Sequence, residues 1–365
     1  MARVRGHESA LDEALFDDNM PASVYHNLID VVREQRPLFE RSINLRKRLL
    51  GLDDLRRYDL RVPLAAESQK EYDYRQAVDM VLGGVGALGD RYVSDLRIGF
   101  DSRWVDVHET KNKRSGAYSW GIYGSPPVML MNWNRTLSDV FTLAHEAGHA
   151  MHTFYANNAQ PMHLAGYPIF LAEIASTVNE VLLTWHLLNT IGADDPAVRF
   201  SLLNRFTDGF DATMVNQTMY ADFELRTHSA AEAGQPLTLE FLDEQFGDVQ
   251  SLYTPGVIVD ETTSINWARV PHFYRAYYVF QYATGLTSAI NIASAVRDEG
   301  DAARDRYLGM LEAGGSDYPL TLLRNAGVDL TTRDPYTVAL AEYEKALAEM
   351  TQLVDDGLVM APALG

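Results

Sequence analysis

Three residues in one short segment could together hold a metal ion and activate a water molecule. His145, Glu146 and His149 lie in the segment that runs from Asp139 to His152. Residues four apart on an α-helix are about 40° apart around its axis, so both imidazoles would project from one face and could share an ion. Glu146 would lie beside that ion without binding it, where a general base is needed. The spacing predicts a hydrolytic metal site.

The surroundings of these residues favour a metal site over ordinary helix positions. The same segment is rich in Phe, Leu and Ala, so the expected helix is apolar around most of its circumference. Imidazoles and a carboxylate are costly in such a helix unless they are paired or coordinated. Gly148 costs about 1 kcal/mol relative to alanine inside a helix and indicates close approach by another group. The alternative is that the histidines are helix-surface or hydrogen-bonded core residues.

The remaining ligand is expected from a second apolar helical segment. The chain has no cysteine, so a metal must be held by imidazole and carboxylate groups. Glu173 and Glu180 are seven residues apart and fall on one helical face. Catalytic zinc takes three protein ligands and a water, so we predict one Zn²⁺ per chain on His145, His149 and Glu173. Glu180 is expected to accept the other N–H of a ligand imidazole; alternatively it is a surface carboxylate.

Two other segments could contribute to the chemistry. Donors are dense between His272 and Tyr282, and such groups could stabilise the negative charge that develops on a carbonyl oxygen during hydrolysis. Tyr274 is a candidate for substrate binding, although packing of its ring is an equal alternative. The segment 115–118, which contains Gly116 and Ala117, is interpreted as a sheet edge near the site, where an extended peptide could pair its backbone as an added strand. The alternative for Gly116 is an ordinary turn.

The elements that must position these residues are mainly helices. Helical periodicity dominates, and a β-type pattern occurs only between about 96 and 132. We therefore expect a mainly α fold with a small β-sheet near the site. Residues 1–365 are expected to form a single catalytic unit, with 1–95 as a leading helical segment and 96–365 as the zinc-binding core. Helices are expected at 8–17, 23–50 with a break near Pro37, 66–87, 136–157, 168–191, 196–232, 237–250, 272–297 and 336–354.

Composition narrows the possible partners. The formal charge of −19 would repel phosphate backbones and anionic lipid surfaces, so neither nucleic acid nor membrane is an expected partner. The first residues contain no signal-like apolar stretch, and no run of 18 apolar residues occurs in the sequence. The expected location is the cytoplasm. The oligomeric state is not predicted by any of these features.

Several motifs together resemble the thimet oligopeptidase and oligoendopeptidase F family of zinc metallopeptidases, and most closely its oligoendopeptidase F branch. The resemblance rests on residues 141–152 (FTLAHEAGHAMH), 170–177 (FLAEIAST), 113–120 (KRSGAYSW) and 271–285 (PHFYRAYYVFQYATG). Residues 45–52 and 58–64 are also similar, so the likeness covers most of the chain. It implies a zincin-type catalytic domain that hydrolyses internal bonds of short peptides in a channel between two helical lobes.

The resemblance also implies roles for the donor-rich segment. His272 matches a family histidine, and Tyr277 matches the tyrosine five positions beyond it, both implied to be catalytic. Gln281 and Thr284 stand where thimet oligopeptidase has tyrosine, and we assign Tyr282 as the donor to the oxyanion.

The chain departs from the family in one respect: full-length members are longer, and we expect the N-terminal helical lobe of those members to be absent here. This leaves two alternatives to an endopeptidase acting on short peptides. One is a zinc carboxypeptidase of similar helical fold, and the other is a catalytically silent peptide-binding protein.

Overall fold

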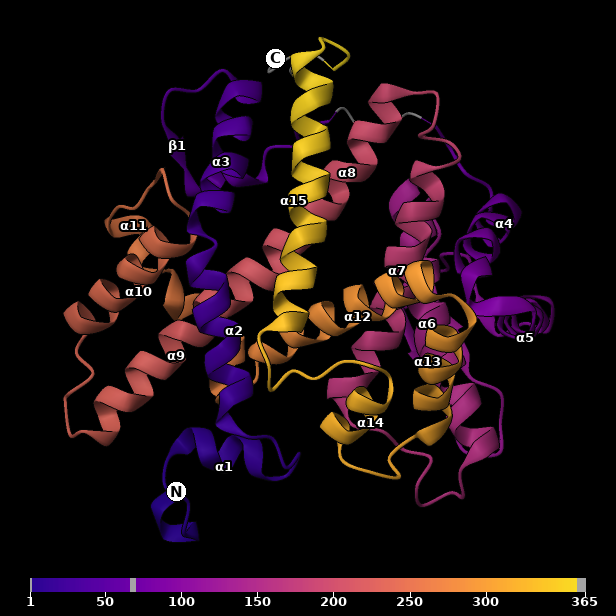
Figure 1. Cartoon of the computed structure of the whole chain (residues 1–365), viewed down its shortest axis with the longest axis horizontal. Coiled ribbons are helices and arrows are strands. Elements are labelled where there is room, and N and C mark those ends of the chain that lie inside the picture. The colour runs from indigo at the N-terminus through magenta and orange to yellow at the C-terminus, as the bar shows by residue number, and fades with distance from the viewer. Residues whose placement is uncertain (1, 66–69, 360–365) are drawn as a thin grey trace. The chain divides into compact units, whose positions relative to one another are not determined.

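The computed structural model describes residues 2–65 and 70–359, which form two compact units. The first comprises the described parts of Met1–Glu67, Leu203–Thr284 and Leu330–Gly365, and the second those of Ser68–Leu202 and Gly285–Asp329. The division falls inside α8 (Pro196–Phe210) and α12 (Phe280–Glu299). The expected mainly α fold with a small sheet is confirmed (Figure 1). The expectation of one catalytic unit stays a prediction. The expected boundary between the leading segment 1–95 and the core 96–365 lies inside the helix Gly89–Asp101.

Several helices of the first unit bury one apolar face. In α2, for example, the buried positions recur at three- and four-residue spacing. Two short parallel strands, β1 (Leu55–Arg56) and β5 (Val257–Ile258), join segments far apart in sequence. The core contains fully buried aromatic rings that include Tyr25, Tyr253 and Phe246. The helices of this unit are α1 (Ala10–Phe16), α2 (Ala22–Glu34), α3 (Arg36–Leu50), α9 (Asn216–Glu232), α10 (Leu239–Tyr253), α11 (Glu261–Ser264) and α15 (Asp334–Asp355).

The second unit packs helices around the pair that carries the expected metal ligands. Helix α6 (Leu137–Ala159) lies along α7 (Ile169–Leu188), and α4 (Tyr74–Gly84) and α13 (Asp301–Ala313) pack against this pair (Figure 1). Helices α5 (Gly89–Asp101) and α14 (Pro319–Asn325), the first part of α8 and most of α12 also belong to this unit. A three-stranded sheet of order β2-β4-β3 contains β2 (Val105–Asp106), β3 (Tyr118–Trp120) and β4 (Val128–Leu130).

Three of the expected helices begin or run differently in the structure. The helix expected at 66–87 starts at Tyr74, because Asp73 caps it by accepting a hydrogen bond from the Gln76 N–H; residues 66–69 lie outside the described residues. The helix expected at 196–232 contains a π-helical turn at Asp211–Val215 between α8 and α9. The helix expected at 272–297 begins only at Phe280, because Tyr277 has a left-handed backbone with φ of 55°.

Candidate metal centre

The metal-binding segment forms one long, well-capped helix. Thr136 accepts a hydrogen bond from the Asp139 N–H, and the Asp139 carboxylate accepts one from the Thr136 N–H. This reciprocal capping fixes the start of α6 two turns before His145. Gly148 lies directly against the backbone of Ala175 and Ser176 on α7, which lets the two helices come close. The helix therefore presents its histidines to α7 at short range.

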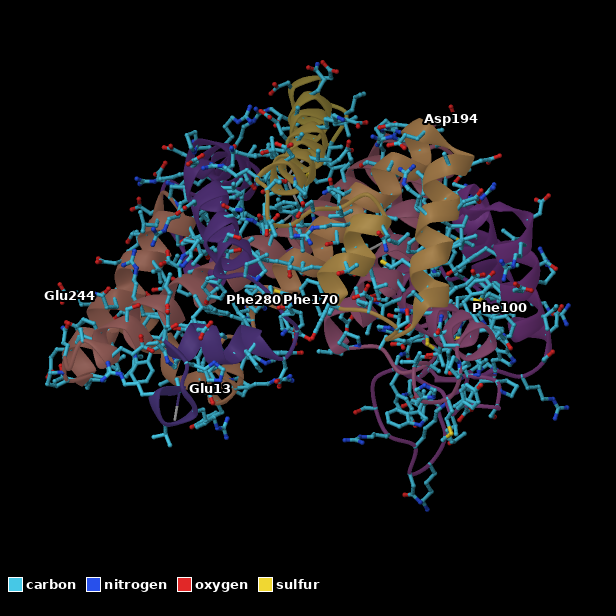
Figure 2. The ribbon with its side chains drawn as sticks, turned by 60° about the horizontal axis from the view of Figure 1, so that its bottom comes forward. Glu13, Phe100, Phe170, Asp194, Glu244 and Phe280 are labelled. Carbon is cyan, nitrogen blue, oxygen red and sulfur yellow. The ribbon has the colours of Figure 1, made fainter. Side chains whose placement is uncertain are left out.

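A second contact fixes how α7 lies along α6. The side-chain N–H of Asn179 donates to the Ala144 carbonyl oxygen at 3.1 Å, and the Asn179 oxygen accepts from the Tyr92 hydroxyl at 3.1 Å. Phe170, labelled in Figure 2 at the start of α7, is also buried. The sequence did not predict this role of Asn179. An asparagine within an apolar helical segment is nevertheless a usable signal, because a buried amide needs hydrogen-bond partners.

The structure brings His145, His149 and Glu173 together. The two Nε2 atoms are 3.2 Å apart, and Glu173 Oε2 lies 3.5 Å from each of them. Four ligands around a tetrahedral zinc at about 2.0 to 2.1 Å are separated from each other by about 3.3 Å. The three atoms thus have the spacing of three corners of such a tetrahedron. This donor set of two imidazole nitrogens and one carboxylate oxygen fits a zinc ion.

Glu180 lies behind the first histidine. Its Oε1 is 2.7 Å from His145 Nδ1, the ring nitrogen that faces away from His149 and Glu173. A carboxylate at this nitrogen fixes the tautomer that leaves Nε2 free for a metal. Burial lowers the pKa of His145, but the hydrogen bond and charge of Glu180, with the charges of Glu173 and Glu146, raise it overall.

The two other glutamates at the site have opposite shifts in pKa. A hydrogen bond from His149 lowers the pKa of Glu173, although burial opposes it. Burial raises the pKa of Glu146, and the neighbouring histidines oppose that shift. Glu146 is only 6% exposed, and its Oε2 has no hydrogen-bond partner among the described residues. A buried carboxyl oxygen without a partner at this position fits a group that receives a proton from a bound molecule.

His152 is a packing residue in the structure. Its ring stacks on Tyr167 with the centroids 3.5 Å apart, and burial lowers its pKa to about 3. Neither ring nitrogen has a hydrogen-bond partner within residues 2–65 and 70–359. His152 therefore remains neutral and lies outside the group of ligand atoms.

The donor-rich segment belongs to the first unit, and its residues differ in exposure. His272, Tyr278 and Tyr282 form a cluster with ring centroids 5.4 to 5.6 Å apart. Tyr274 is 96% exposed. Tyr278 is one of the donors expected in this segment, with packing of its ring as an equal alternative, and its ring lies beside those of His272 and Tyr282.

Tyr277, which the resemblance implies to be catalytic, is largely buried in the structure. Its ring is 3% exposed and packs against Tyr25 and His228, with centroids 5.4 and 4.8 Å away. The ring therefore offers little surface to a substrate, and the catalytic role of Tyr277 stays a prediction. Its backbone N–H donates to the Glu224 carboxylate at 2.9 Å, which holds the left-handed bend of the segment.

Gly116 and Ala117 lie immediately before strand β3. Gly116 has φ of 87°, a left-handed conformation that favours glycine, and its carbonyl oxygen accepts a hydrogen bond from the Asn132 side chain at 2.8 Å. Lys113, whose side chain is 5% exposed, donates to the carbonyl oxygens of Asp106 and His108. The loop before β3 is thus held by hydrogen bonds from two side chains.

A mainly helical protein with two imidazoles and a carboxylate in this arrangement is typical of metallopeptidases. The chain belongs to Peptidase family M3, whose sequence pattern matches residues 1–342. It is 43% identical over 354 residues to oligopeptidase PepF of Bacillus subtilis, covering 97% of this chain and 52% of that protein. It is 40% identical over 359 residues to an oligoendopeptidase F homolog of Lactococcus lactis, covering 98% of this chain and 59% of that protein.

A solved structure agrees with these sequence relatives. The crystal structure of oligoendopeptidase-F from Enterococcus faecium superposes with a TM-score of 0.78 at 35% identity, covering 97% of this chain and 57% of that one. The chain thus spans between half and three fifths of the length of these relatives. Among the described residues, we find no helix with the length and apolarity needed to cross a membrane.

Proposed function

We propose that the chain is a zinc-dependent endopeptidase that hydrolyses internal bonds of short peptides. The observation that carries this proposal is the spacing of 3.2 to 3.5 Å between the ligand atoms of His145, His149 and Glu173. These three residues would hold one zinc ion per chain. When bound, zinc acts as a Lewis acid and lowers the pKa of a coordinated water. The relatives are named as an oligopeptidase and an oligoendopeptidase F homolog, which supports short peptides as the substrate class.

Glu146 is the proposed general base. Its unpartnered Oε2 accepts the proton of the attacking water, and the raised pKa lets the carboxyl hold that proton and donate it to the departing amine. Glu180 keeps His145 Nδ1 protonated and the ring in position. Each of these steps uses a side chain of the second unit.

The remaining proposed roles belong to the donor-rich segment and to the loop before β3. Tyr282 donates to the oxyanion, and His272, which lies 5.6 Å from its ring, shares this role. Tyr274 binds the substrate from its exposed position. The backbone around Gly116 and Ala117 approaches the extended peptide at the edge of the sheet. The location in the cytoplasm stays a prediction from the sequence.

The decisive experiment is a peptide-length series with identification of every product by mass spectrometry. Peptides blocked at both ends, and the same peptides with free C-termini, are incubated with the zinc-loaded chain, with and without a chelator, and with zinc restored. We expect internal cleavage that the chelator abolishes and zinc restores. The matched variant Glu146→Gln should bind zinc equally well and lose nearly all turnover.

The other outcomes would each reject the proposal in a different way. Release of single residues from free C-termini, with blocked peptides left intact, would identify a carboxypeptidase. Binding of peptides without any product would identify a silent peptide-binding protein, a possibility that the partial coverage of the relatives keeps open. Wild-type activity in Glu146→Gln would remove the assigned base.

A further inference from the structure

The small sheet of the second unit has two faces of different character. Strand β3 pairs antiparallel with β4, and the partners are Tyr118 with Leu130, Ser119 with Met129 and Trp120 with Val128. Because side chains alternate along a strand, each pair lies on one face of the sheet. The Ser119 and Met129 pair lies on the inner face, where Met129 is 1% exposed. The other two pairs define what we call the outer face.

The outer face is apolar and open to solvent. Tyr118 is 47% exposed, Trp120 is 66% exposed and Val128 is 51% exposed. Ile122, which follows β3, is 66% exposed. A solvated face of an antiparallel sheet ordinarily carries polar side chains. Clustered exposed apolar residues of this size are typical of a binding surface.

The strand that carries this face is also an edge strand. In the order β2-β4-β3, one side of β3 has no neighbouring strand in the described sheet. Proteins usually protect such edges with lysine, proline or a bulge, and the residues of β3 are Tyr, Ser and Trp. An unprotected edge can accept an extended peptide as an added strand.

The position of this edge strand is fixed relative to the helix of the metal ligands. A Cβ placed on Gly121, the residue after β3, would lie 2.2 Å from Cγ2 of Thr153. Thr153 is one helical turn beyond His149 on α6, so β3 ends in direct contact with the ligand-bearing helix. A peptide that pairs with β3 would therefore lie near α6, the helix that carries His145 and His149.

We propose that Tyr118, Trp120 and Val128 bind an apolar side chain of the peptide and make the chain select aromatic or aliphatic residues at alternate positions. This rests on the proposed endopeptidase function. Every second side chain of an added strand lies beside the outer face, within about 5 Å of its cross-strand neighbours. Asp106 of β2 lies on the same face beside Leu130 and is paired with Lys113, whereas Tyr118, Trp120 and Val128 are uncharged. A neutral apolar side chain therefore matches these three residues better than an ionic one.

The experiment scans one peptide scaffold position by position with Leu, Phe, Arg and Ser, and compares kcat/KM and the cleavage site for wild type and Trp120→Ala. In the wild type, kcat/KM should be about 10- to 100-fold higher for Leu and Phe than for Ser at two peptide positions that are separated by one residue. At the residue between them, the wild type should show no such preference. Trp120→Ala should reduce this preference at least about fivefold. Trp120→Phe should largely restore it, and Ile98→Ala, which removes an exposed side chain on α5, should leave it unchanged.

The results distinguish this inference from the proposed function. Cleavage whose side-chain preference is the same in Trp120→Ala and wild type would overturn the inference and leave the function intact. If nothing is cleaved, the same peptides are titrated calorimetrically against the zinc-loaded chain. Tighter binding of the Leu and Phe peptides that is lost in Trp120→Ala would then support this inference without supporting the proposed endopeptidase function. A stronger preference for Arg would overturn the inference in favour of cation–π binding. Sedimentation that shows a dimer of the wild type and a monomer of Trp120→Ala would also overturn it, because the outer face would then bind a second copy of the chain.

Discussion

A Cβ placed on Gly148 would lie 2.4 Å from the carbonyl oxygen of Ala175 and 2.6 Å from the Cα of Ser176. Both neighbours are backbone atoms of α7, so they cannot move aside as a flexible side chain would. His149 follows Gly148 on α6, and Glu173 lies two residues before Ala175 on α7. The close approach at this glycine therefore sets the distance between ligands on different helices.

Gly148→Ala should both destabilise the chain and weaken zinc binding. The added methyl group forces α6 and α7 apart, which costs about 1 to 3 kcal/mol of unfolding free energy and separates His149 from Glu173. Urea unfolding and a zinc titration measure the two effects. Gly309→Ala is the matched control, because this helical glycine of α13 has nothing within 4 Å of an added Cβ. Equal zinc affinity in both variants would contradict the argument.

Glu180→Gln should lower zinc affinity without removing a proposed ligand. The amide oxygen of glutamine can still accept the hydrogen bond that His145 Nδ1 donates at 2.7 Å, but it carries no negative charge, so the ring becomes less basic and a weaker ligand. Loss of such a partner typically costs 10- to 100-fold in metal affinity. Competition with a chromogenic chelator measures it. Glu109→Gln, at an exposed loop position, serves as control, and equal affinities would show that Glu180 has no role at the metal.

Tyr282→Phe and Tyr277→Phe should differ sharply in their kinetics. Removing a donor to the oxyanion typically reduces kcat by about 10²- to 10³-fold, and this is expected for Tyr282. The Tyr277 ring is buried against Tyr25 and His228, so the loss of its hydroxyl should change kcat/KM little. Steady-state kinetics on one blocked peptide compares the two. A large loss in Tyr277→Phe with a small loss in Tyr282→Phe would reverse the assignment.

Glu224→Gln should become relatively more stable as pH rises. Burial raises the pKa of Glu224 to about 7, against the opposing hydrogen bond from the Tyr277 N–H, and the ordinary value is 4.5. Between these values the folded state keeps a proton that the unfolded state has lost. The wild type therefore loses stability as pH rises through this window, by at most about 3 kcal/mol.

The glutamine variant lacks this titration and still offers an oxygen to the Tyr277 N–H. Urea midpoints at pH 5 and pH 8 should show the difference between variant and wild type moving in favour of the variant. If that difference stayed constant with pH, Glu224 would be ionised in the fold throughout the window.

The sequence predicted those features that depend on spacing along one helix. The offsets of His145, Glu146 and His149, and the shared face of Glu173 and Glu180, follow from helical geometry alone. The capping of α6 by Thr136 was similarly visible, because threonine followed three residues later by aspartate is a local signal.

Other features depend on tertiary contacts that leave no local signal. The left-handed backbone of Tyr277 is held by Glu224, 53 residues away, and tyrosine itself gives no indication of it. The pairing of β1 with β5 joins residues separated by about 200 positions in two strands of two residues each. The exposed outer face of the small sheet could not be distinguished from a buried one, because apolar residues on a strand ordinarily predict burial.

The most direct test of the central claim is a crystal structure of the zinc-loaded chain with anomalous data collected at the zinc edge. A single anomalous peak should lie about 2.0 to 2.2 Å from the Nε2 atoms of His145 and His149 and from a carboxylate oxygen of Glu173. Glu146 should lie beside the ion without bonding to it. A peak elsewhere, or a Glu173 side chain turned away from the two imidazoles, would contradict the proposed site and the hydrolysis derived from it.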